Sequence, residues 1–293
     1  MSKNMMLCIE HGPWLRRYGL EKSCEQLAKA GFNGFDYTEL CDTNLPLWHL
    51  TEEQFKEELI NVKNVAASYG LAVYQTHCPW RFPPEDYTEE QRAERLEKFE
   101  KAVRGTAYLG CRIMIVHCVM PWGAQACEDR DEFIRINAEF FGKLALTAKE
   151  FDVEIHVETL PFPRLPINST QECLDFAKLM NEKTGTDLFR VCIDTGHCNF
   201  CSEDPATAVR LVGGEMLGSL HVHDNNGHAD QHLIPGNGTI NWESFSDALR
   251  EVGYKGTFSF ETGVPRDIPN GDECDHIERE IVELGHKLAK NNV

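Results

Sequence analysis

The strongest constraint on the fold of this chain is the regular alternation of short apolar runs with longer stretches of helical period, repeated eight times over 293 residues. The short runs are rich in β-branched and aromatic residues, which favour strands, whereas the longer stretches repeat apolar residues every three or four positions. Alternation of strand and helix predicts a parallel sheet joined by crossover helices. The eight units average about 37 residues, which suits a βαβ element of roughly 30 residues plus its loop.

Turn residues and helix start signals set the boundaries of the predicted elements. Thr51, Thr88 and Asn241 each stand directly before a helical stretch, where their side chains can cap the first turn. The predicted strands are Met6–Glu10, Gly34–Glu39, Leu71–His77, Arg112–His117, Glu154–Thr159, Phe189–Thr195, Gly218–Asp224 and Thr257–Thr262. The predicted helices are Leu20–Ala30, Glu52–Tyr69, Glu89–Leu109, Arg130–Glu150, Thr170–Asn181, Asp204–Leu211, Trp242–Val252 and Cys274–Ala289.

These elements predict an α/β fold, a (β/α)₈ TIM barrel formed as a single domain over residues 1–293. The length agrees, because such barrels usually need about 250 residues before insertions. A doubly wound open sheet is the competing architecture. However, the first strand-to-helix turn, EHGPW at residues 10–14, contains no GxGxxG motif that could cradle a dinucleotide.

Side-chain parity in the last four predicted strands separates an apolar face from a polar one. The apolar set should face the surrounding helices and comprises Ile155, Val157, Val191, Ile193, Leu220, Val222, Phe258 and Phe260. The polar set should point into the barrel and comprises Glu154, His156, Glu158, Arg190, Cys192, Asp194, Ser219, His221, His223, Thr257, Ser259 and Glu261. Barrel centres are ordinarily filled by branched apolar residues. Unpaired buried charges are costly, so this interior needs partners, of which a cation is the simplest.

Four of these polar residues, Glu158, Asp194, His221 and Glu261, stand at or near the carboxyl ends of successive strands. That rim is where barrel enzymes carry their chemistry. Three carboxylates and one imidazole form an oxygen-rich set that favours Mn²⁺, Mg²⁺ or a similar divalent ion over a thiolate zinc site. Taken singly, each residue could instead form a salt bridge or a core hydrogen bond. Together they predict one divalent metal site.

Charge and cysteine content narrow the partners and the compartment. A formal charge of −18 would repel phosphate-rich partners on average, so no nucleic acid partner is expected. The sequence has no run of about 18 apolar residues and no signal peptide, which predicts a cytoplasmic protein without membrane contact. The 12 cysteines are dispersed, so reduced thiols are expected, including the Cys198-Asn-Phe-Cys201 pair. The sequence leaves homo-oligomerisation open.

Five segments of the chain resemble the sugar isomerase/epimerase family of xylose isomerase-like TIM barrels, whose relatives include ketose 3-epimerases, inosose dehydratase and hydroxypyruvate isomerase. The resemblance covers nearly the whole chain and is strongest in its second half. The segments are IHVET around Glu158, CIDTGH at Cys192–His197, LHVHDN at Leu220–Asn225, DQHLIPGNGTINW at Asp230–Trp242 and GYKGTFSFE at Gly253–Glu261. Each is modestly specific alone, and their order and spacing together are much more so.

This resemblance implies that Glu158, Asp194, His221 and Glu261 bind one divalent metal ion, with Mn²⁺ favoured and Mg²⁺, Co²⁺ and Zn²⁺ as alternatives. It also implies that Glu158 and Glu261 are the catalytic acid/base pair of an isomerase or epimerase. Such an enzyme moves a carbon-bound proton of a small ketose, aldose or related polyol through an enediolate, while the metal polarises the substrate oxygens. Loss of a β-hydroxyl would instead make the chain an inosose-type dehydratase.

Further residues of the rim are predicted to contact a carbohydrate substrate. By the resemblance, the polar contacts are His197, His77, His117, Asp230 and His232. Aromatic residues of strand-end loops could form an apolar wall against the sugar, or pack locally: Trp14, Trp80, Trp122 and Phe200. A phosphorylated sugar would need a cationic pocket, for which three scattered loop residues are available: Arg81, Arg164 and Arg266.

Two further hypotheses stay open. The more distantly related endonuclease IV barrels bind three zinc ions, and the chain matches every ligand, namely the four residues above together with His77, His117, His197, Asp230 and His232. The flanks depart from the nuclease pattern, with Cys-Val-Met-Pro after His117 and Thr-Leu-Pro after Glu158, and no basic loop suggests a DNA clamp. The other hypothesis is a catalytic subunit of a glycoside-cleaving complex that needs its partner for activity.

Overall fold

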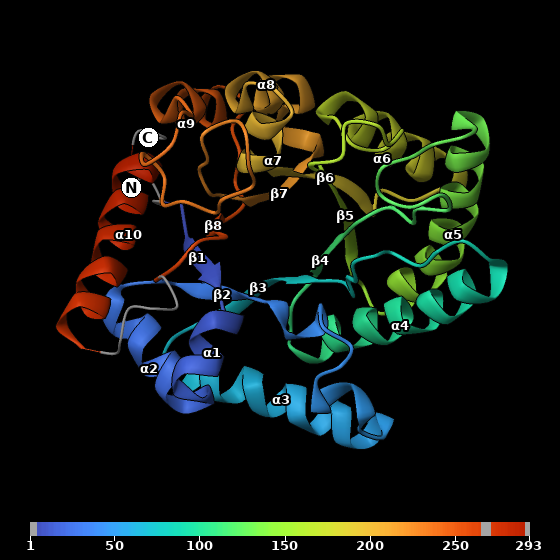
Figure 1. Ribbon diagram of the computed structural model, residues 1–293. Coiled ribbons are helices and arrows are strands. Elements are labelled where there is room, and N and C mark those ends of the chain that lie inside the picture. The colour runs from blue at the N-terminus through green and yellow to red at the C-terminus, as the bar shows by residue number, and fades with distance from the viewer. Residues whose placement is uncertain (1–4, 265–270, 291–293) are drawn as a thin grey trace.

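The computed structural model of the protein describes residues 5–264 and 271–290. Within these ranges, eight parallel strands form one sheet in the order β7-β6-β5-β4-β3-β2-β1-β8. The strands are β1 (Leu7–Glu10), β2 (Gly34–Tyr37), β3 (Ala72–His77), β4 (Ile113–Val116), β5 (Glu154–Glu158), β6 (Phe189–Asp194), β7 (Leu217–His221) and β8 (Phe258–Phe260). A parallel bridge between Val222 and Phe260 brings β7 against β8, so the sheet curls into a nearly closed barrel (Figure 1).

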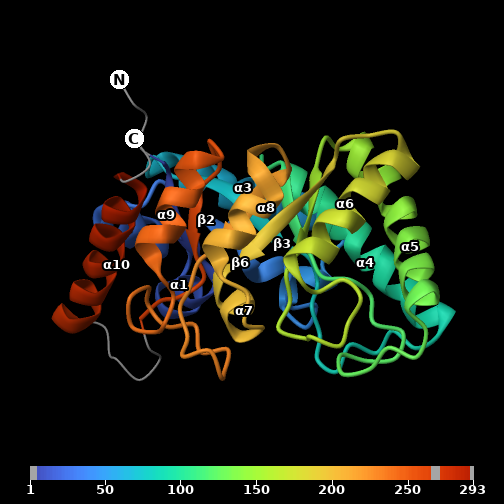
Figure 2. The ribbon, with the colours of Figure 1, turned by 90° about the horizontal axis from the view of Figure 1, so that it is seen from above.

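Helices surround the barrel on its outside, and at least one follows each strand (Figures 1 and 2). They are α1 (Gly12–Tyr18), α2 (Leu20–Ala30), α3 (Glu52–Ser68), α4 (Glu89–Tyr108), α5 (Arg130–Glu150), α6 (Thr170–Thr184), α7 (Thr195–Phe200), α8 (Pro205–Met216), α9 (Trp242–Glu251) and α10 (Asp272–Lys290). Two 3₁₀ turns, η1 (Thr38–Leu40) and η2 (Pro46–His49), follow β2. The predicted (β/α)₈ barrel is therefore confirmed.

The predicted helices all form, and the predicted capping residues begin them. Thr51, Thr88 and Asn241 accept hydrogen bonds from backbone N–H groups in the first turns of α3, α4 and α9. The sequence does not predict α1 and α7, because seven and six residues are too few to display an apolar period. The N-cap of α7 is Asp194, whose Oδ1 accepts a hydrogen bond from the His197 backbone N–H at 2.6 Å.

Two helices run at least three residues past their predicted C-terminal ends. The helix α6 continues to Thr184 and ends at Gly185, which adopts the left-handed conformation with φ of 62°. The helix α8 continues to Met216 through a kink at Gly213, whose φ of 72° is open to glycine and strained for other residues. Local sequence pattern cannot predict such an extension, because Gly213 and its neighbour read as a helix stop.

The strand parity predicted from the sequence is observed. Every member of the apolar set in β5 to β8 is at most 1% exposed, between the sheet and the helices. Inside the barrel, His156 is fully buried, with Nδ1 2.9 Å from Ser219 Oγ and Nε2 3.2 Å from Glu154 Oε2. The Arg190 Nε donates to the same Glu154 oxygen at 2.9 Å. Polar groups in this part of the barrel therefore satisfy one another.

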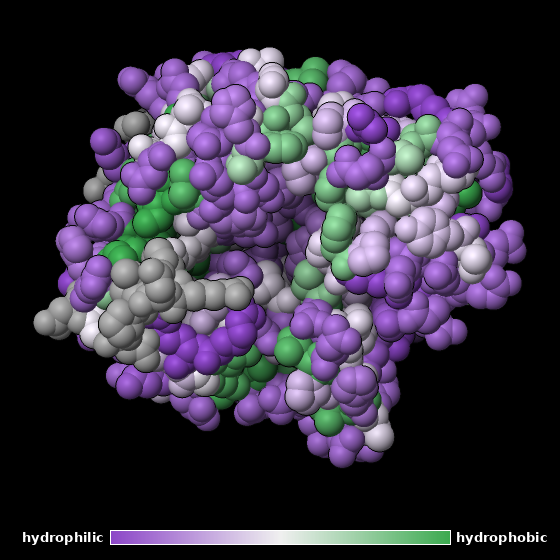
Figure 3. Space-filling model, in the orientation of Figure 1, coloured by the Kyte–Doolittle hydropathy of each residue, from purple (hydrophilic) through white to green (hydrophobic). Residues whose placement is uncertain are grey.

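The loops that follow the strands gather at one end of the barrel, together with α7 (Figure 2). The space-filling view onto this end shows a hollow near the barrel axis, bordered largely by hydrophilic residues (Figure 3). All 12 cysteines are free thiols, as expected, and the Cys198 and Cys201 thiols donate to Thr159 Oγ1 and the Leu160 carbonyl. In the described part of the chain, no helix combines the length and apolarity needed to cross a bilayer.

Candidate metal centre

The strand ends bring together the four residues predicted to bind a metal. Glu158, Asp194 and His221 are the last residues of β5, β6 and β7, and Glu261 directly follows β8. One potential ligand atom of each lies within 4.8 Å of the others. The register contributes to this convergence, because Asp194 and His221 are direct partners across β6 and β7. The side chains meet as the parity argument predicts, and their binding of a metal stays a prediction.

Three carboxylates enclose His221. Its Nδ1 lies 2.7 Å from Glu158 Oε1 and 3.3 Å from Glu261 Oε2, while its Nε2 lies 2.9 Å from Asp36 Oδ2. Burial alone would lower the pKa of His221, but the Glu261 and Glu158 carboxylates outweigh burial and raise that pKa well above its usual value. An imidazole holds at most two protons. A protonated ring therefore supplies a single positive charge to three neighbouring acids, and a cation would balance any further ionised carboxylate.

Histidines contact both oxygens of Glu158, which is 1% exposed. Its Oε2 lies 2.7 Å from His117 Nε2 and 3.2 Å from His77 Nε2, while Oε1 faces His221. Burial would raise the pKa of Glu158, but the neighbouring His221 and His117 outweigh it and hold that pKa well below the usual range. Glu158 is therefore the ionised centre of the group.

Glu261 has a different environment. Its side chain is 21% exposed, yet its Oε2 is buried without a hydrogen-bond partner among the described residues. Burial raises the pKa of Glu261 to about 7. A buried acceptor without a donor is unfavourable. A divalent cation held by the four side chains would supply the missing partner and favour the ionised carboxylate, so this donor set fits such an ion.

A second group of acids and histidines lies beside Asp194. The Oδ2 of Asp194 is 3.0 Å from His223 Nε2. Farther out, His197 Nε2 and His232 Nε2 each lie 3.4 Å from Asp230 Oδ2. Burial would lower the pKa of His197, but Asp194 and the hydrogen bond to Asp230 outweigh it and raise that pKa to about 10. These polar residues of the predicted substrate set are therefore charged neighbours of the quartet, the name used below for Glu158, Asp194, His221 and Glu261.

The backbone of His232 is left-handed, with φ of 49°. This conformation costs a non-glycine residue on the order of 1 kcal/mol and persists where the surroundings hold it. Here the His232 ring stacks on His223 with centroids 4.0 Å apart, and its Nδ1 lies 2.8 Å from the Glu261 carbonyl oxygen. Thr262 Oγ1 donates to the His232 carbonyl oxygen at 2.6 Å. The loop after β7 is thus tied to the end of β8.

Several overlapping trios of side chains also bring potential metal ligands within 4.8 Å of one another. They include His77–His117–Glu158, Asp194–His197–His223 and His223–His232–Glu261. Because His77, His117, His197 and His232 belong to the predicted substrate set, the same residues could serve a substrate or a further ion.

The aromatic residues predicted to form a substrate wall occupy different places. Trp80 lies against His117, with ring centroids 4.6 Å apart, and 6.3 Å from Phe162. Trp14 is 4% exposed and packs on aromatic rings within the N-terminal helical region, while Trp122 packs on a ring of α5. Among these rings, the contact with the Glu158 group is made by Trp80, and substrate contact by Trp14 and Trp122 stays a prediction.

The structure describes two of the three loop arginines proposed for a phosphate. Arg81 Nε donates to the Pro84 carbonyl at 2.8 Å, and its Nη1 lies 3.3 Å from Glu94, so it is engaged within its own segment. Arg164 is exposed. Arg266 lies outside the described residues.

Two central residues are not among the site residues predicted from the sequence, namely Asp36 on β2 and Gln75 on β3. Gln75 Nε2 donates to Asp36 Oδ2 at 2.9 Å, the same oxygen that faces His221. The sequence does contain a signal for Asp36, because an acidic residue between Phe35 and Tyr37 is unusual in a strand that is fully buried. The clear alternation of polar and apolar side chains lies in the last four strands, whereas Asp36 and Gln75 belong to β2 and β3.

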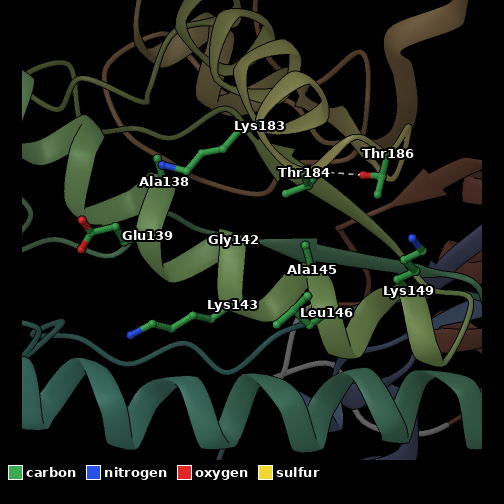
Figure 4. Close-up of a pocket in the computed structure, with 10 residues that line it drawn as sticks. All are labelled: Ala138, Glu139, Gly142, Lys143, Ala145, Leu146, Lys149, Lys183, Thr184 and Thr186. Atoms are coloured by element: carbon green, nitrogen blue, oxygen red, sulfur yellow. Dashed lines mark hydrogen bonds between the residues drawn. The ribbon is translucent and has the colours of Figure 1, made fainter.

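A groove of about 480 Å³ lies on the outer wall between α5 and α6 (Figure 4). It is lined by Ala138, Glu139, Gly142, Lys143, Ala145, Leu146, Lys149, Lys183, Thr184 and Thr186. Its lining residues include no histidine or cysteine and a single carboxylate, and helices rather than strand ends carry most of them. The groove therefore does not compete with the rim as the site of the chemistry.

Comparison with known proteins agrees with this architecture. The family model of the xylose isomerase-like TIM barrel matches residues 24–281. The chain belongs to this family. A D-psicose 3-epimerase of Ruminiclostridium cellulolyticum is 29% identical over 280 residues, which cover 87% of this chain and 86% of that protein. An uncharacterised protein of Methanocaldococcus jannaschii is 28% identical over 222 residues, which cover 73% of this chain and 72% of that protein.

Solved structures agree with the family fold. The D-psicose 3-epimerase of Clostridium cellulolyticum, determined with D-tagatose, has a TM-score of 0.76 against this barrel. The match covers 97% of this chain and 99% of that chain at 21% identity, a level that supports the fold alone. The resemblance inferred from the five sequence segments is therefore confirmed at the level of family and fold.

Proposed function

We propose that this protein is a divalent-metal-dependent sugar isomerase or epimerase, which transfers a carbon-bound proton of a small ketose, aldose or related polyol through an enediolate. The observation that carries the proposal is the convergence of Glu158, Asp194, His221 and Glu261 within 4.8 Å at the strand ends of a barrel. Similarity to a D-psicose 3-epimerase over most of the chain supports the substrate class.

The four converging residues would hold one divalent cation, with Mn²⁺ as the first choice and Mg²⁺, Co²⁺ or Zn²⁺ as alternatives. When bound, the cation would polarise a carbonyl and an adjacent hydroxyl of the sugar and so lower the cost of removing the carbon-bound proton. The carboxylate-rich composition of the quartet supports an ion of this hard type over a thiolate-bound one.

Glu158 and Glu261 would be the acid/base pair. They come from β5 and the end of β8, and a carboxyl oxygen of each faces His221 Nδ1. A sugar carbon held between the two side chains would meet a carboxyl group on each face. Removal of the proton by one and return by the other inverts the carbon, which is epimerisation. Return to the neighbouring carbon is aldose–ketose isomerisation. The polar residues His197, Asp230 and His232 would bind the sugar hydroxyls.

Solvent-hydrogen exchange tests the acid/base assignment. The purified protein with Mn²⁺ is incubated in D₂O with a panel of ketoses, aldoses and inososes, and deuterium in the sugar is measured by mass spectrometry. Because general acid/base catalysis contributes about 10²–10⁴-fold, Glu158→Gln and Glu261→Gln should each slow exchange by that factor. Glu57→Gln, a change on the exposed face of α3, should leave the rate unchanged. Exchange retained in both site variants would contradict the assignment.

A second candidate function is a phosphodiesterase of the endonuclease IV type with three zinc ions. The observations that favour it are the His77–His117–Glu158 group and the position of Asp230 between His197 and His232. The charge of −18 opposes it, since DNA would be repelled. Elemental analysis returning one metal per chain, and no cleavage of abasic-site DNA, would exclude this candidate.

Dehydration and dependence on a partner are the remaining alternatives. Mass spectrometry of an inosose reaction separates dehydration from isomerisation, because only dehydration removes the mass of water. A catalytic subunit of a glycoside-cleaving complex would be inactive by itself. Activity of the single purified chain on a free sugar would contradict that hypothesis.

A further inference from the structure

Asp36 is a buried carboxylate in the middle of β2, with a relative exposure of 1%. Within the described residues, its Oδ2 lies 2.9 Å from His221 Nε2 and accepts a hydrogen bond from Gln75 Nε2 at 2.9 Å. Its Oδ1 is buried without a hydrogen-bond partner, and no arginine or lysine pairs with it in that part of the chain. Burying an acidic side chain in this way is costly unless the contacts it makes compensate.

The contact with His221 has a definite chemical consequence. A histidine that ligates a cation through Nδ1 carries its ring proton on Nε2, and in His221 that N–H would donate to Asp36 Oδ2, which lies 2.9 Å from Nε2. The other nitrogen, Nδ1, then keeps its lone pair. That nitrogen faces Glu158 Oε1 at 2.7 Å and Glu261 Oε2 at 3.3 Å, in the middle of the quartet.

We propose that Asp36 is a positioning residue, which holds His221 as the Nε2–H tautomer and aims Nδ1 at the cation. The inference rests on the proposed metal dependence. A histidine ligand commonly donates its other N–H to a carboxylate, which fixes the ring orientation and makes the ligand nitrogen more basic. Asp36 reaches His221 from β2 across the interior of the barrel, 185 residues away in sequence.

Gln75 completes the arrangement by holding Asp36 in place. Its side chain is fully buried on β3, and its Nε2 lies within hydrogen-bond distance of both Asp36 Oδ2 and the Leu220 carbonyl oxygen, at 2.9 and 3.3 Å. Leu220 directly precedes His221. One amide group thus connects β2, β3 and β7, so the carboxylate and the imidazole keep their relative positions.

Metal affinity tests the inference with a readout other than catalysis. Isothermal titration of Mn²⁺ into the full-length chain should give an affinity 10–100-fold weaker for Asp36→Asn than for the wild type, the loss typical of removing such a partner. The matched control is Asp86→Asn, which alters another fully buried carboxylate, one paired with Arg95. It should lower the thermal stability and leave the Mn²⁺ affinity within twofold of the wild type.

The outcomes separate this inference from the proposed function. Equal affinity in the wild type and Asp36→Asn would overturn the positioning role while leaving metal dependence intact. A wild type that binds no divalent ion would overturn both. A loss of affinity in Asp86→Asn as large as in Asp36→Asn would show that any damaged core weakens binding, and would also overturn the specific role.

The tautomer itself can be read in the wild-type protein, which keeps the test valid if Asp36→Asn fails to fold. With ¹⁵N-labelled histidine and diamagnetic Zn²⁺ or Mg²⁺, long-range ¹H–¹⁵N spectra report which ring nitrogen carries the proton. The His221 signals are assigned by their loss in His221→Gln. A protonated Nε2 and an unprotonated Nδ1 are expected, and a proton on Nδ1 would overturn the inference.

Discussion

At the scale of single residues, the histidines of this protein differ in which protonation state their surroundings favour. His11, directly after β1, is fully buried, with its ring stacked on Phe35 at 4.1 Å and its Nε2 2.9 Å from Ser23 Oγ. Carboxylates raise the pKa of His221, but His11 has no such neighbour among its contacts, and burial lowers its pKa to about 3. It is therefore held neutral in the folded protein.

His11 should make the folded protein less stable as the pH falls. Its pKa is about 3 when folded against 6.5 for a free side chain, so between these values the unfolded chain binds more protons. The stability it contributes is complete above pH 6.5 and is lost as the pH falls toward 3, with a slope of up to about 1.4 kcal/mol per pH unit. The free energy of unfolding, measured by urea denaturation between pH 7.5 and 5 with a chelator present, should depend less steeply on pH in His11→Gln than in the wild type.

An exposed histidine provides the control for this measurement. His276 lies on α10 with a side chain that is 65% exposed. His276→Gln should therefore keep the wild-type pH dependence. Identical slopes for His11→Gln and the wild type would contradict the assignment of the effect to His11.

At the scale of elements, close contacts inside the barrel limit which residues β7 can carry. A Cβ atom added at Gly218 would lie 2.4 Å from the His156 ring, in the hydrogen-bonded interior network. Neither ring nor strand can move freely there. Gly218→Ala should therefore lower the free energy of unfolding by about 1–3 kcal/mol, as for other overpacked cores. The midpoint of urea denaturation measures the change.

Gly142 in α5 is the matched control, because an added Cβ would meet no atom within 4 Å. Alanine favours a helix interior over glycine, so Gly142→Ala should raise the stability by up to about 1 kcal/mol. The two glycine substitutions thus have opposite expected signs. A Gly218→Ala protein as stable as the wild type would show that the His156 ring can yield.

At the scale of the whole molecule, metal binding should stabilise the barrel, because the proposed ligands come from β5, β6, β7 and the end of β8. An ion at 100 times its Kd stabilises the folded state by about 2.7 kcal/mol. For a chain of this size, that corresponds to a rise in Tm of about 4 °C. Differential scanning calorimetry in chelator and in excess Mn²⁺ measures the shift.

Asp194→Asn is the control for metal-linked stability, since it removes one proposed ligand charge. Its Tm should respond much less to Mn²⁺ than that of the wild type. The same Tm for the wild type in chelator and in Mn²⁺ would contradict a metal site that spans the strands.

Oligomeric state, cellular compartment and the extension of the domain to both chain ends stay predictions.

The sequence by itself determined the (β/α)₈ barrel, because strand and helix periods are local and repeat along the whole chain. It also determined which side chains of β5 to β8 point inward, since parity follows from the backbone of each strand, and so it predicted the meeting of Glu158, Asp194, His221 and Glu261. The bounds of α2 and α5 match the predicted residues for the same local reason.

Only the tertiary structure decided which inward residues meet across the barrel. Asp36 and His221 are 185 residues apart, and no local pattern relates β2 to β7. Parity places both side chains inside a closed barrel, but strand register and closure decide that Asp36 Oδ2 reaches His221 Nε2. Closure likewise decided that Trp80 lies against His117 while Trp14 packs away among helices. Contacts between distant strands depend on the whole sheet, and the whole sheet exists only once the chain has folded.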